Sequence, residues 1–128
     1  MTVTATYNAE KGWFEHRVSG LMLAAEVGAA IVKMLTSQHW GDGKARLILV
    51  DPATDMSEFT LDAIRDDILS VLASHTDKLT GRHKAAMVTT GFGHDIITQL
   101  YELVPENKSA FVYRHFTTED EAVAWLES

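Results

Sequence analysis

The chain has 128 residues, no cysteine and a formal net charge of −7 at neutral pH. This length predicts a single domain spanning 1–128. A domain of this size buries enough apolar surface to fold without disulfides or a structural metal. The missing thiols exclude disulfides, zinc–thiolate sites, iron–sulfur clusters and thiol catalysis, and the acidic balance argues against nucleic-acid binding, because Lys and Arg supply most of that affinity.

Two segments near the start alternate apolar and polar side chains, namely Val3–Tyr7 and Trp13–Val18. This period of two is typical of β-strands, and the turn-forming stretch 8–12 between them predicts an antiparallel hairpin. Over Leu23–His39 the apolar spacing becomes helical. Gly28 inside this helix lets a neighbouring backbone approach closely, and we expect that neighbour to be the domain's own sheet.

Two later runs, Ala45–Val50 and Ala85–Val88, are almost continuously apolar. Such runs predict central strands that are covered on both faces. Each is followed by apolar residues at helical spacing, over 61–72 and over 96–104. The first of these helices carries three carboxylates near its start that predict a solvated face: Asp62, Asp66 and Asp67.

The end of the chain predicts one more strand and one more helix. The strand is expected over Ala110–Phe116, and Thr118 and Glu121 fit a capping box that opens the helix. The resulting order is β-β-α-β-α-β-α-β-α. Because strands separated by helices run parallel, we expect an α/β fold with a mixed, mostly parallel five-stranded sheet.

This order, together with Phe116–Leu126, resembles the SpoIIAA-like branch of the STAS superfamily (sulfate transporter and anti-sigma factor antagonist domains). The matching stretch has a Phe, an acidic helix start and the pattern Ala-x-x-Trp-Leu. The resemblance implies that consecutive strands lie side by side with the helices mainly on one face. STAS antagonists carry a phosphorylatable serine directly after an Asp at a strand end, but Pro52 follows Asp51 here. A phosphorylation switch is therefore not implied.

Ligands of parallel sheets bind beyond the carboxyl ends of the strands, so the loops after the two central strands are the candidate binding site. The predicted ligand-binding residues are Asp51, Thr54, Asp55 and Ser57 in one loop, and Thr90, Gly91, Gly93, His94 and Asp95 in the other. The glycines favour a tight turn over a phosphate loop, because the third glycine of the dinucleotide fingerprint is Ile96. A Ser57–His94–Asp51 triad is conceivable, but no nucleophile elbow surrounds Ser57. We predict no catalytic residue.

The six histidines are scattered, and no two have the i, i+4 spacing that places two metal ligands on one helix face. We predict no metal and no cofactor. His75 is expected to be a boundary residue bonded to the backbone, and Arg82–Lys84 a solvated loop. Met1–Thr4 is not the start of a signal peptide, and the longest apolar run, Leu21–Ala25, is far below the ~20 residues that span a bilayer. A cytoplasmic protein without membrane insertion is expected.

For function, the first expectation is a non-enzymatic interaction or regulatory module that binds a protein partner or a second copy as a homodimer. Helices on one face would leave apolar strand residues poorly covered on the other. Those residues are Leu47, Leu49, Ala86 and Val88. The alternative is a carrier for a small apolar or lipid-like ligand, because STAS-type domains look similar to CRAL-TRIO lipid-binding domains. A buried, mostly apolar cavity between helices and sheet would favour the carrier. A hydrolase is the third alternative.

Overall fold

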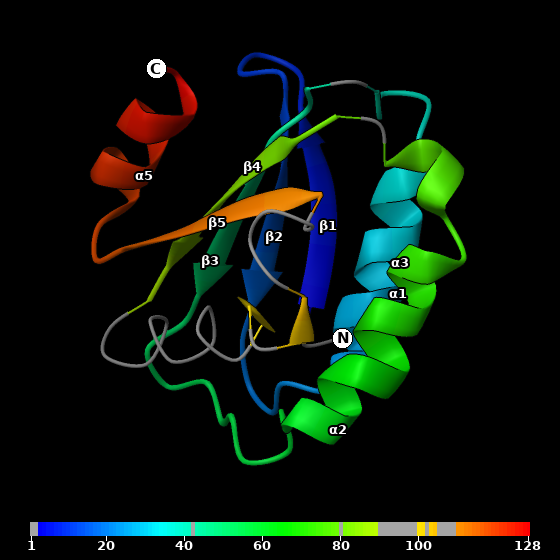
Figure 1. Ribbon diagram of the computed structural model, residues 1–128. Coiled ribbons are helices and arrows are strands. Elements are labelled where there is room, and N and C mark those ends of the chain that lie inside the picture. The colour runs from blue at the N-terminus through cyan, green and yellow to red at the C-terminus, as the bar shows by residue number, and fades with distance from the viewer. Residues whose placement is uncertain (1–2, 42, 80, 90–99, 102, 105–109) are drawn as a thin grey trace.

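A mixed five-stranded sheet forms the centre of the chain, with its strands side by side in sequence order (Figure 1). The computed structural model describes residues 3–41, 43–79, 81–89, 100–101, 103–104 and 110–128. β1 and β2 pair antiparallel, and the three other neighbouring pairs are parallel. The predicted α/β class is therefore confirmed. The strands are β1 (Val3–Asn8), β2 (Trp13–Val18), β3 (Arg46–Val50), β4 (His83–Val88) and β5 (Phe111–Phe116).

The predicted hairpin is confirmed by β1 and β2, in which Val3 lies opposite Val18. The turn closes with a hydrogen bond of 2.8 Å from the Gly12 N–H to the Asn8 carbonyl. Gly12 has a φ of 78°, a backbone conformation that residues with a Cβ rarely adopt. The alternation of side chains therefore sends Phe14 and Val18 to one face of the sheet, where both are buried.

The start of β4 corrects the solvated loop predicted over Arg82–Lys84. The strand already begins at His83, which pairs with Phe111 and is fully buried. The His83 ring stacks on Trp40 at 4.5 Å, and its Nδ1 lies 2.7 Å from the Lys44 carbonyl oxygen. Strand pairing and the contact with Trp40 together bury His83, although its neighbours in the sequence are charged.

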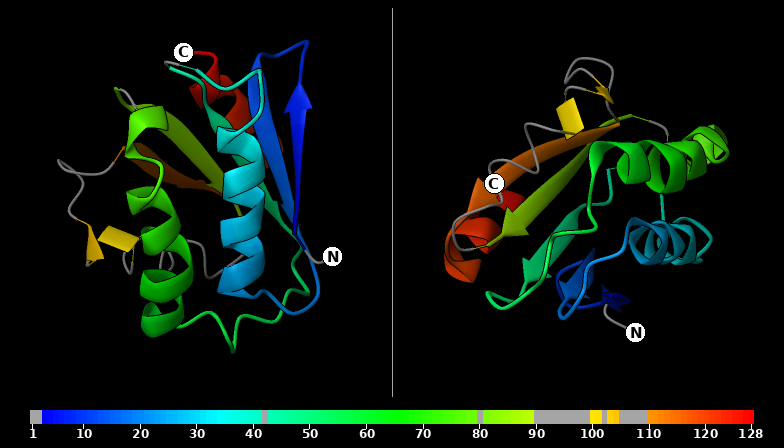
Figure 2. Two further views of the ribbon diagram at one scale, coloured as in Figure 1. Left: turned by 90° about the vertical axis from the view of Figure 1, so that its right-hand side faces the viewer. Right: turned by 90° about the horizontal axis from the view of Figure 1, so that it is seen from below.

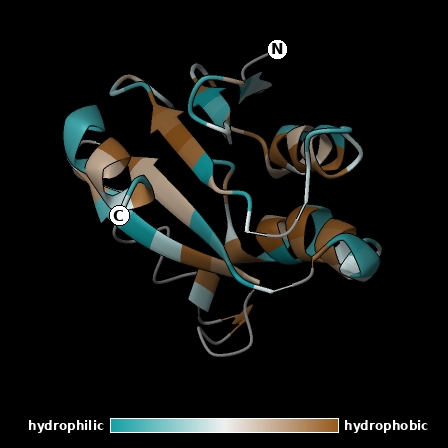
Figure 3. Cartoon of the chain, turned by 90° about the horizontal axis from the view of Figure 1, so that it is seen from above, coloured by the Kyte–Doolittle hydropathy of each residue, from teal (hydrophilic) through white to brown (hydrophobic). Residues whose placement is uncertain are grey.

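Two helical segments cover one face of the sheet (Figure 2). The first is α1 (Ala24–Leu35), which ends before the predicted His39. The second is one continuous run through α2 (Leu61–Ile64), the π-helical turn η1 (Arg65–Leu69) and α3 (Ser70–Ala73), with the 3-10 turn η2 (Thr76–Lys78) after it. Apolar residues run along the central strands and these segments (Figure 3). The largest fully buried apolar side chains between these two segments and the sheet are Val3, Ile31, Met34, Leu35, Ile64 and Phe111.

The close approach at Gly28 involves the second helical segment rather than the sheet, which corrects the expectation above. A Cβ added at Gly28 would overlap the carbonyl oxygen of Asp67, and Val71 lies beside it. Asp67 belongs to the π-helical turn. The missing side chain of Gly28 therefore sets how closely α1 and η1 pack.

The opposite face of the sheet is covered in part by α5 (Glu119–Leu126), as Figure 2 shows. Leu47 and Ala86, which were expected to be poorly covered, are only 1% and 0% exposed. Leu49 and Val88 are half-buried against the same cluster. The expected bare apolar face is therefore wrong for these strands, because the last helix crosses to the other side of the sheet.

Local bonds position α5. Thr118 is its N-cap, as predicted, and the Thr118 hydroxyl accepts a hydrogen bond of 3.3 Å from the Glu121 N–H. At the other end, Lys84 Nζ donates to the Trp125 carbonyl at 3.0 Å and lies 5.3 Å from the centre of its ring. A cation at a helix C-terminus also favours the helix dipole. β4 therefore holds α5 by a charged side chain as well as by apolar contact.

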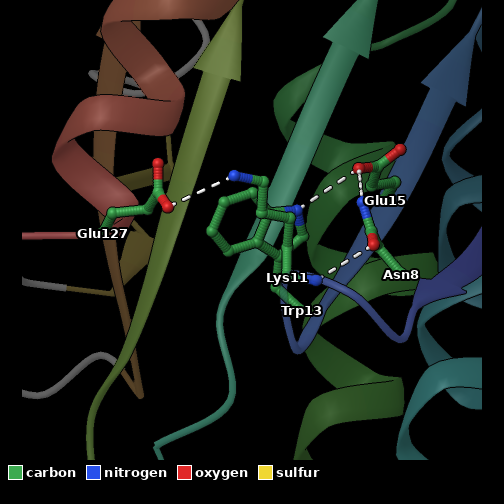
Figure 4. A network of polar contacts seen from close by, with 5 residues as sticks. All are labelled: Asn8, Lys11, Trp13, Glu15 and Glu127. Atoms are coloured by element: carbon green, nitrogen blue, oxygen red, sulfur yellow. Dashed lines mark hydrogen bonds and ion pairs between the residues drawn. The ribbon is translucent and has the colours of Figure 1, made fainter.

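A polar network joins the hairpin to α5 (Figure 4). Glu15 Oε2 accepts hydrogen bonds from Asn8 Nδ2 at 2.9 Å and from Trp13 Nε1 at 3.3 Å. Lys11 Nζ pairs with Glu127 Oε2 at 3.3 Å. This exposed pair contributes little stability, but the Glu15 contact satisfies the indole N–H of the buried Trp13.

Of the helix predicted over 96–104, residues 96–99 and 102 lie outside the described residues. Within the part of the chain that the structure describes, no helix is long and apolar enough to cross a membrane.

Replacing Gly28 by Ala tests the packing of α1 on η1. Helix propensity alone predicts a gain of about 1 kcal/mol in stability, whereas overlap with the Asp67 carbonyl predicts a loss of about 1–3 kcal/mol. We expect the loss, measured as the free energy of unfolding in urea. Ala29→Gly, at an exposed site on the same helix, is the control and should cost only about 1 kcal/mol. A Gly28→Ala protein more stable than the parent would refute the close contact.

Candidate functional site

The polar side chains predicted to bind a ligand after β3 instead hold their own loop together. Asp51 Oδ1 accepts a hydrogen bond of 2.8 Å from the Ala53 N–H, and Asp55 Oδ1 one of 2.9 Å from the Ser57 N–H. Hydrogen bonding to the backbone and side chain of Ser57 lowers the pKa of Asp55. Thr54 is buried, and its hydroxyl donates to the Val18 carbonyl at 3.3 Å. The two aspartate contacts are turn-forming, whereas the Thr54 contact ties the loop to the end of β2.

The same loop explains the uncapped start of α1. Leu23 is the N-cap residue and its side chain makes no capping bond. The Asp55 N–H donates to the Gly20 carbonyl at 2.7 Å, and the Met22 N–H donates to the Asp55 carbonyl at 2.9 Å. A short bridge between Leu21 and Asp55 therefore fixes the chain before the helix, in place of a capping side chain.

The remaining predicted site residues, Thr90, Gly91, Gly93, His94 and Asp95, lie outside the described residues. The conceivable Ser57–His94–Asp51 triad therefore stays untested. Among the four described residues, Asp51 lines a concave surface. It contributes to a strand-end cleft of about 350 Å³ that is lined by Arg17, Val18, Ser19, Leu49, Val50, Asp51, Val88 and Glu119.

A larger concavity lies on the helical face of the sheet. It is a cleft of about 370 Å³ between the second helical segment, β5 and the residues Leu100, Tyr101 and Val104, called the α3–β5 cleft below. None of the four described site residues lines it. Its lining is mostly apolar and consists of Ile68, Leu69, Leu72, Ala73, Thr76, Leu79, Leu100, Tyr101, Val104, Ala110, Phe111 and Tyr113.

A smaller cavity of about 40 Å³ lies deeper, between α1 and the sheet, and is called the Arg46 cavity. It is lined by apolar side chains and by two polar ones, His16 and Arg46, which are only 2% and 3% exposed. It shares Ile68, Leu100 and Tyr113 with the α3–β5 cleft. The two spaces therefore adjoin through common walls.

Arg46 and His16 form a buried hydrogen bond, with Arg46 Nε 3.3 Å from His16 Nε2. The guanidinium always carries its proton on Nε, so Arg46 donates and the imidazole accepts through an unprotonated Nε2. Burial lowers the pKa of His16 well below its ordinary value, and the charge of Arg46 lowers it further. His16 is therefore neutral, and the pair carries a net charge of +1.

The Arg46 side chain lies toward β5. Ala85 is its neighbour on β4, and Tyr113 is the neighbour of Ala85 on β5. The small Ala85 side chain leaves space above it, and the Arg46 Cζ lies 4.8 Å from the centre of the Phe111 ring. Burial lowers the pKa of Arg46, while the adjacent Tyr113 raises it.

No carboxylate among the described residues balances the charge of Arg46. Its NH1 is buried and has no hydrogen-bond acceptor among the described residues. The ion pairs within the described ranges do not include Arg46. Buried charges in proteins are normally paired, so this guanidinium is an exception in the core.

Sequence reasoning missed Arg46, although a signal was present. The run Ala45–Val50 predicts a strand covered on both faces, so its one charged member has to be buried as well. His16 carries no such signal, because a lone histidine on an alternating strand has no metal-ligand spacing. His75 behaves as predicted, since its Nδ1 lies 2.8 Å from the Val71 carbonyl oxygen. Within the described part of the chain, no three His, Asp or Glu side chains gather to hold a metal.

Comparison with known proteins found no matching family model, no matching curated protein and no matching solved structure. The geometry of the chain is therefore the basis of the functional argument.

The buried His16 predicts a pH-dependent stability. Its folded-state pKa lies below the unfolded value near 6.5, so the unfolded chain binds a proton that the folded chain does not. Stability is therefore lost as the pH falls below about 6.5, by about 1.4 kcal/mol per pH unit until the folded-state pKa is reached.

The control for this prediction is His16→Gln, which keeps a neutral acceptor for Arg46 but does not titrate. Chemical denaturation at pH 7 and pH 5 should show a smaller loss of unfolding free energy in the variant than in the parent. Parallel pH profiles of the two proteins would contradict a buried, neutral His16.

Proposed function

We propose that this protein is a carrier that binds a small, largely apolar ligand in the α3–β5 cleft. The observation that carries the proposal is the cleft itself, whose volume of about 370 Å³ lies within the ~300–1,000 Å³ of typical small-molecule sites. It lies between helices and sheet, where a carrier would need its cavity. The sequence favoured an interaction module over a carrier. The carrier is now preferred, because α5 covers most of the apolar strand face that the module would have used.

The lining supports an apolar ligand. Leu69, Leu72, Leu79 and Val104 are half-buried side chains along the cleft. Water against such a wall is unfavourable by roughly 25 cal/mol for each Å² of apolar surface, which a bound hydrocarbon removes. Few polar groups line the cleft. Most of the affinity for a ligand would therefore come from apolar contact, and the polar groups would set its orientation.

The second candidate is the expected interaction module, with a protein partner or a second copy as its ligand. It is favoured by the strand-end cleft, where Leu49 and Val88 are half-buried beside the charged Arg17, Asp51 and Glu119. An apolar floor with charged edges is typical of protein interfaces. This function would use the carboxyl ends of the strands, so it is compatible with a carrier site on the helical face.

The SpoIIAA-like, STAS-like family and its mostly parallel sheet remain proposals as well. They are supported by the sequential strand order and by the final helix after Phe116. The lack of cysteine supports the proposed cytoplasmic location.

An uncharged apolar fluorophore, N-phenyl-1-naphthylamine, tests the carrier. Its emission should rise on binding to the parent protein. Ala73→Trp places a large ring at an exposed position on the cleft wall and should weaken binding by about tenfold or more. Ala29→Trp, at an exposed position of α1 that does not line the cleft, is the matched control and should bind like the parent.

Native mass spectrometry separates the two candidate functions. A small molecule that purifies with the protein supports the carrier, and a defined dimer without ligand supports the interaction module. No fluorophore binding, or equal binding by both tryptophan variants and the parent, would refute the proposed site.

A further inference from the structure

The Arg46 cavity contains a cation that the described part of the protein does not neutralise. Arg46 is only 3% exposed, its NH1 has no acceptor among the described residues, and its neighbours His16 and Tyr113 bring no carboxylate to it. Guanidinium does not lose its proton in proteins, so this charge is present at all accessible pH values. A buried charge without a partner is costly, which suggests that the partner arrives with a ligand.

We propose that the ligand is an amphipathic monocarboxylic acid, whose carboxylate pairs with Arg46 in the Arg46 cavity while its hydrocarbon part occupies the α3–β5 cleft. This inference rests on the proposed carrier function. It adds the chemical class of the ligand and the residue that recognises its head group.

The arrangement of the two spaces supports one ligand that spans both. Tyr113, Ile68 and Leu100 line the larger cleft and the smaller cavity alike. Arg46 lines the smaller cavity, whereas Leu69, Leu72 and Leu79 line the larger cleft. A molecule with one charged end and a hydrocarbon body matches this division.

The size and hydrogen bonding of the cavity favour a carboxylate over a larger anion. About 40 Å³ accommodates a group of a few atoms. Arg46 Nε is already bonded to His16 and the guanidinium also interacts with Tyr113, whereas the buried NH1 has no acceptor among the described residues. A singly charged carboxylate balances the charge of the pair, whereas a phosphate would bring excess charge and require more donors.

A buried water is the neutral alternative occupant. It would accept a hydrogen bond from NH1 but would not cancel the charge. The two occupants differ in a measurable way, because only the carboxylate makes affinity for a ligand depend on the charge of Arg46.

The test compares octanoate with 1-octanol, which share the hydrocarbon chain and differ in the charged head. Calorimetric titration of the parent protein at pH 7.5 should give octanoate the higher affinity by on the order of 10- to 100-fold. Arg46→Met should remove this preference and leave the affinity for octanol within about threefold of the parent. Arg17→Met removes an exposed arginine of β2 with the same change in net charge, and it should retain the preference.

The outcomes separate the two proposals. If neither compound binds the parent, the carrier function and this inference both fail. If both bind with equal affinity, or if Arg46→Met retains the preference for octanoate, the carrier stands and the carboxylate site is refuted.

A second measurement uses the parent protein alone, so it decides the question even when Arg46→Met does not fold. Nuclear Overhauser contacts should join the C2 methylene protons of octanoate to the ring protons of Tyr113 and His16. Contacts of these rings with the terminal methyl group instead would reverse the orientation and overturn the proposal.

Discussion

Two strands that are apolar on both faces impose the main constraint on this protein. Alternate residues of β3 and β4 point to opposite sides of the sheet, and both sets are largely apolar. Each face therefore has to be covered, since exposed apolar area of this extent is unfavourable in water. α1 and the second helical segment cover one face, and α5 covers part of the other. The smaller apolar cluster under α5 leaves little strand surface for a partner to cover. The larger open apolar surface is the cleft on the helical face.

Arg46 is the exception to this constraint. A charged side chain occupies a position where the pattern of β3 calls for an apolar one, and it lies between the sheet and the helices. Replacing buried ionic groups by apolar residues often stabilises a protein, so a core arginine is not explained by stability alone. Its position beside an apolar cleft is the basis of the role in ligand recognition that we propose.

Much of the architecture was predictable from the sequence, and the particular elements show why. The hairpin, the two central strands, the last strand and the Thr118-capped helix all follow from local periodicity or a local cap. The candidate site was not predictable in this way. Asp51, Asp55 and Ser57 have the composition of a binding loop, yet turns use the same residues for hydrogen bonds within the loop. Composition alone does not distinguish the two uses.

The sequence by itself determined where strands and helices form and which side chains share a face, because these properties depend on neighbours within a few residues. Tertiary structure decided which distant groups meet. Gly28 approaches Asp67, Arg46 meets His16 from 30 positions away, and α5 closes over Leu47. Periodicity assigns a residue to the buried side but contains no information on its partner there. That partner depends on how whole elements pack, and the unbalanced charge of Arg46 appears only once the packing is known.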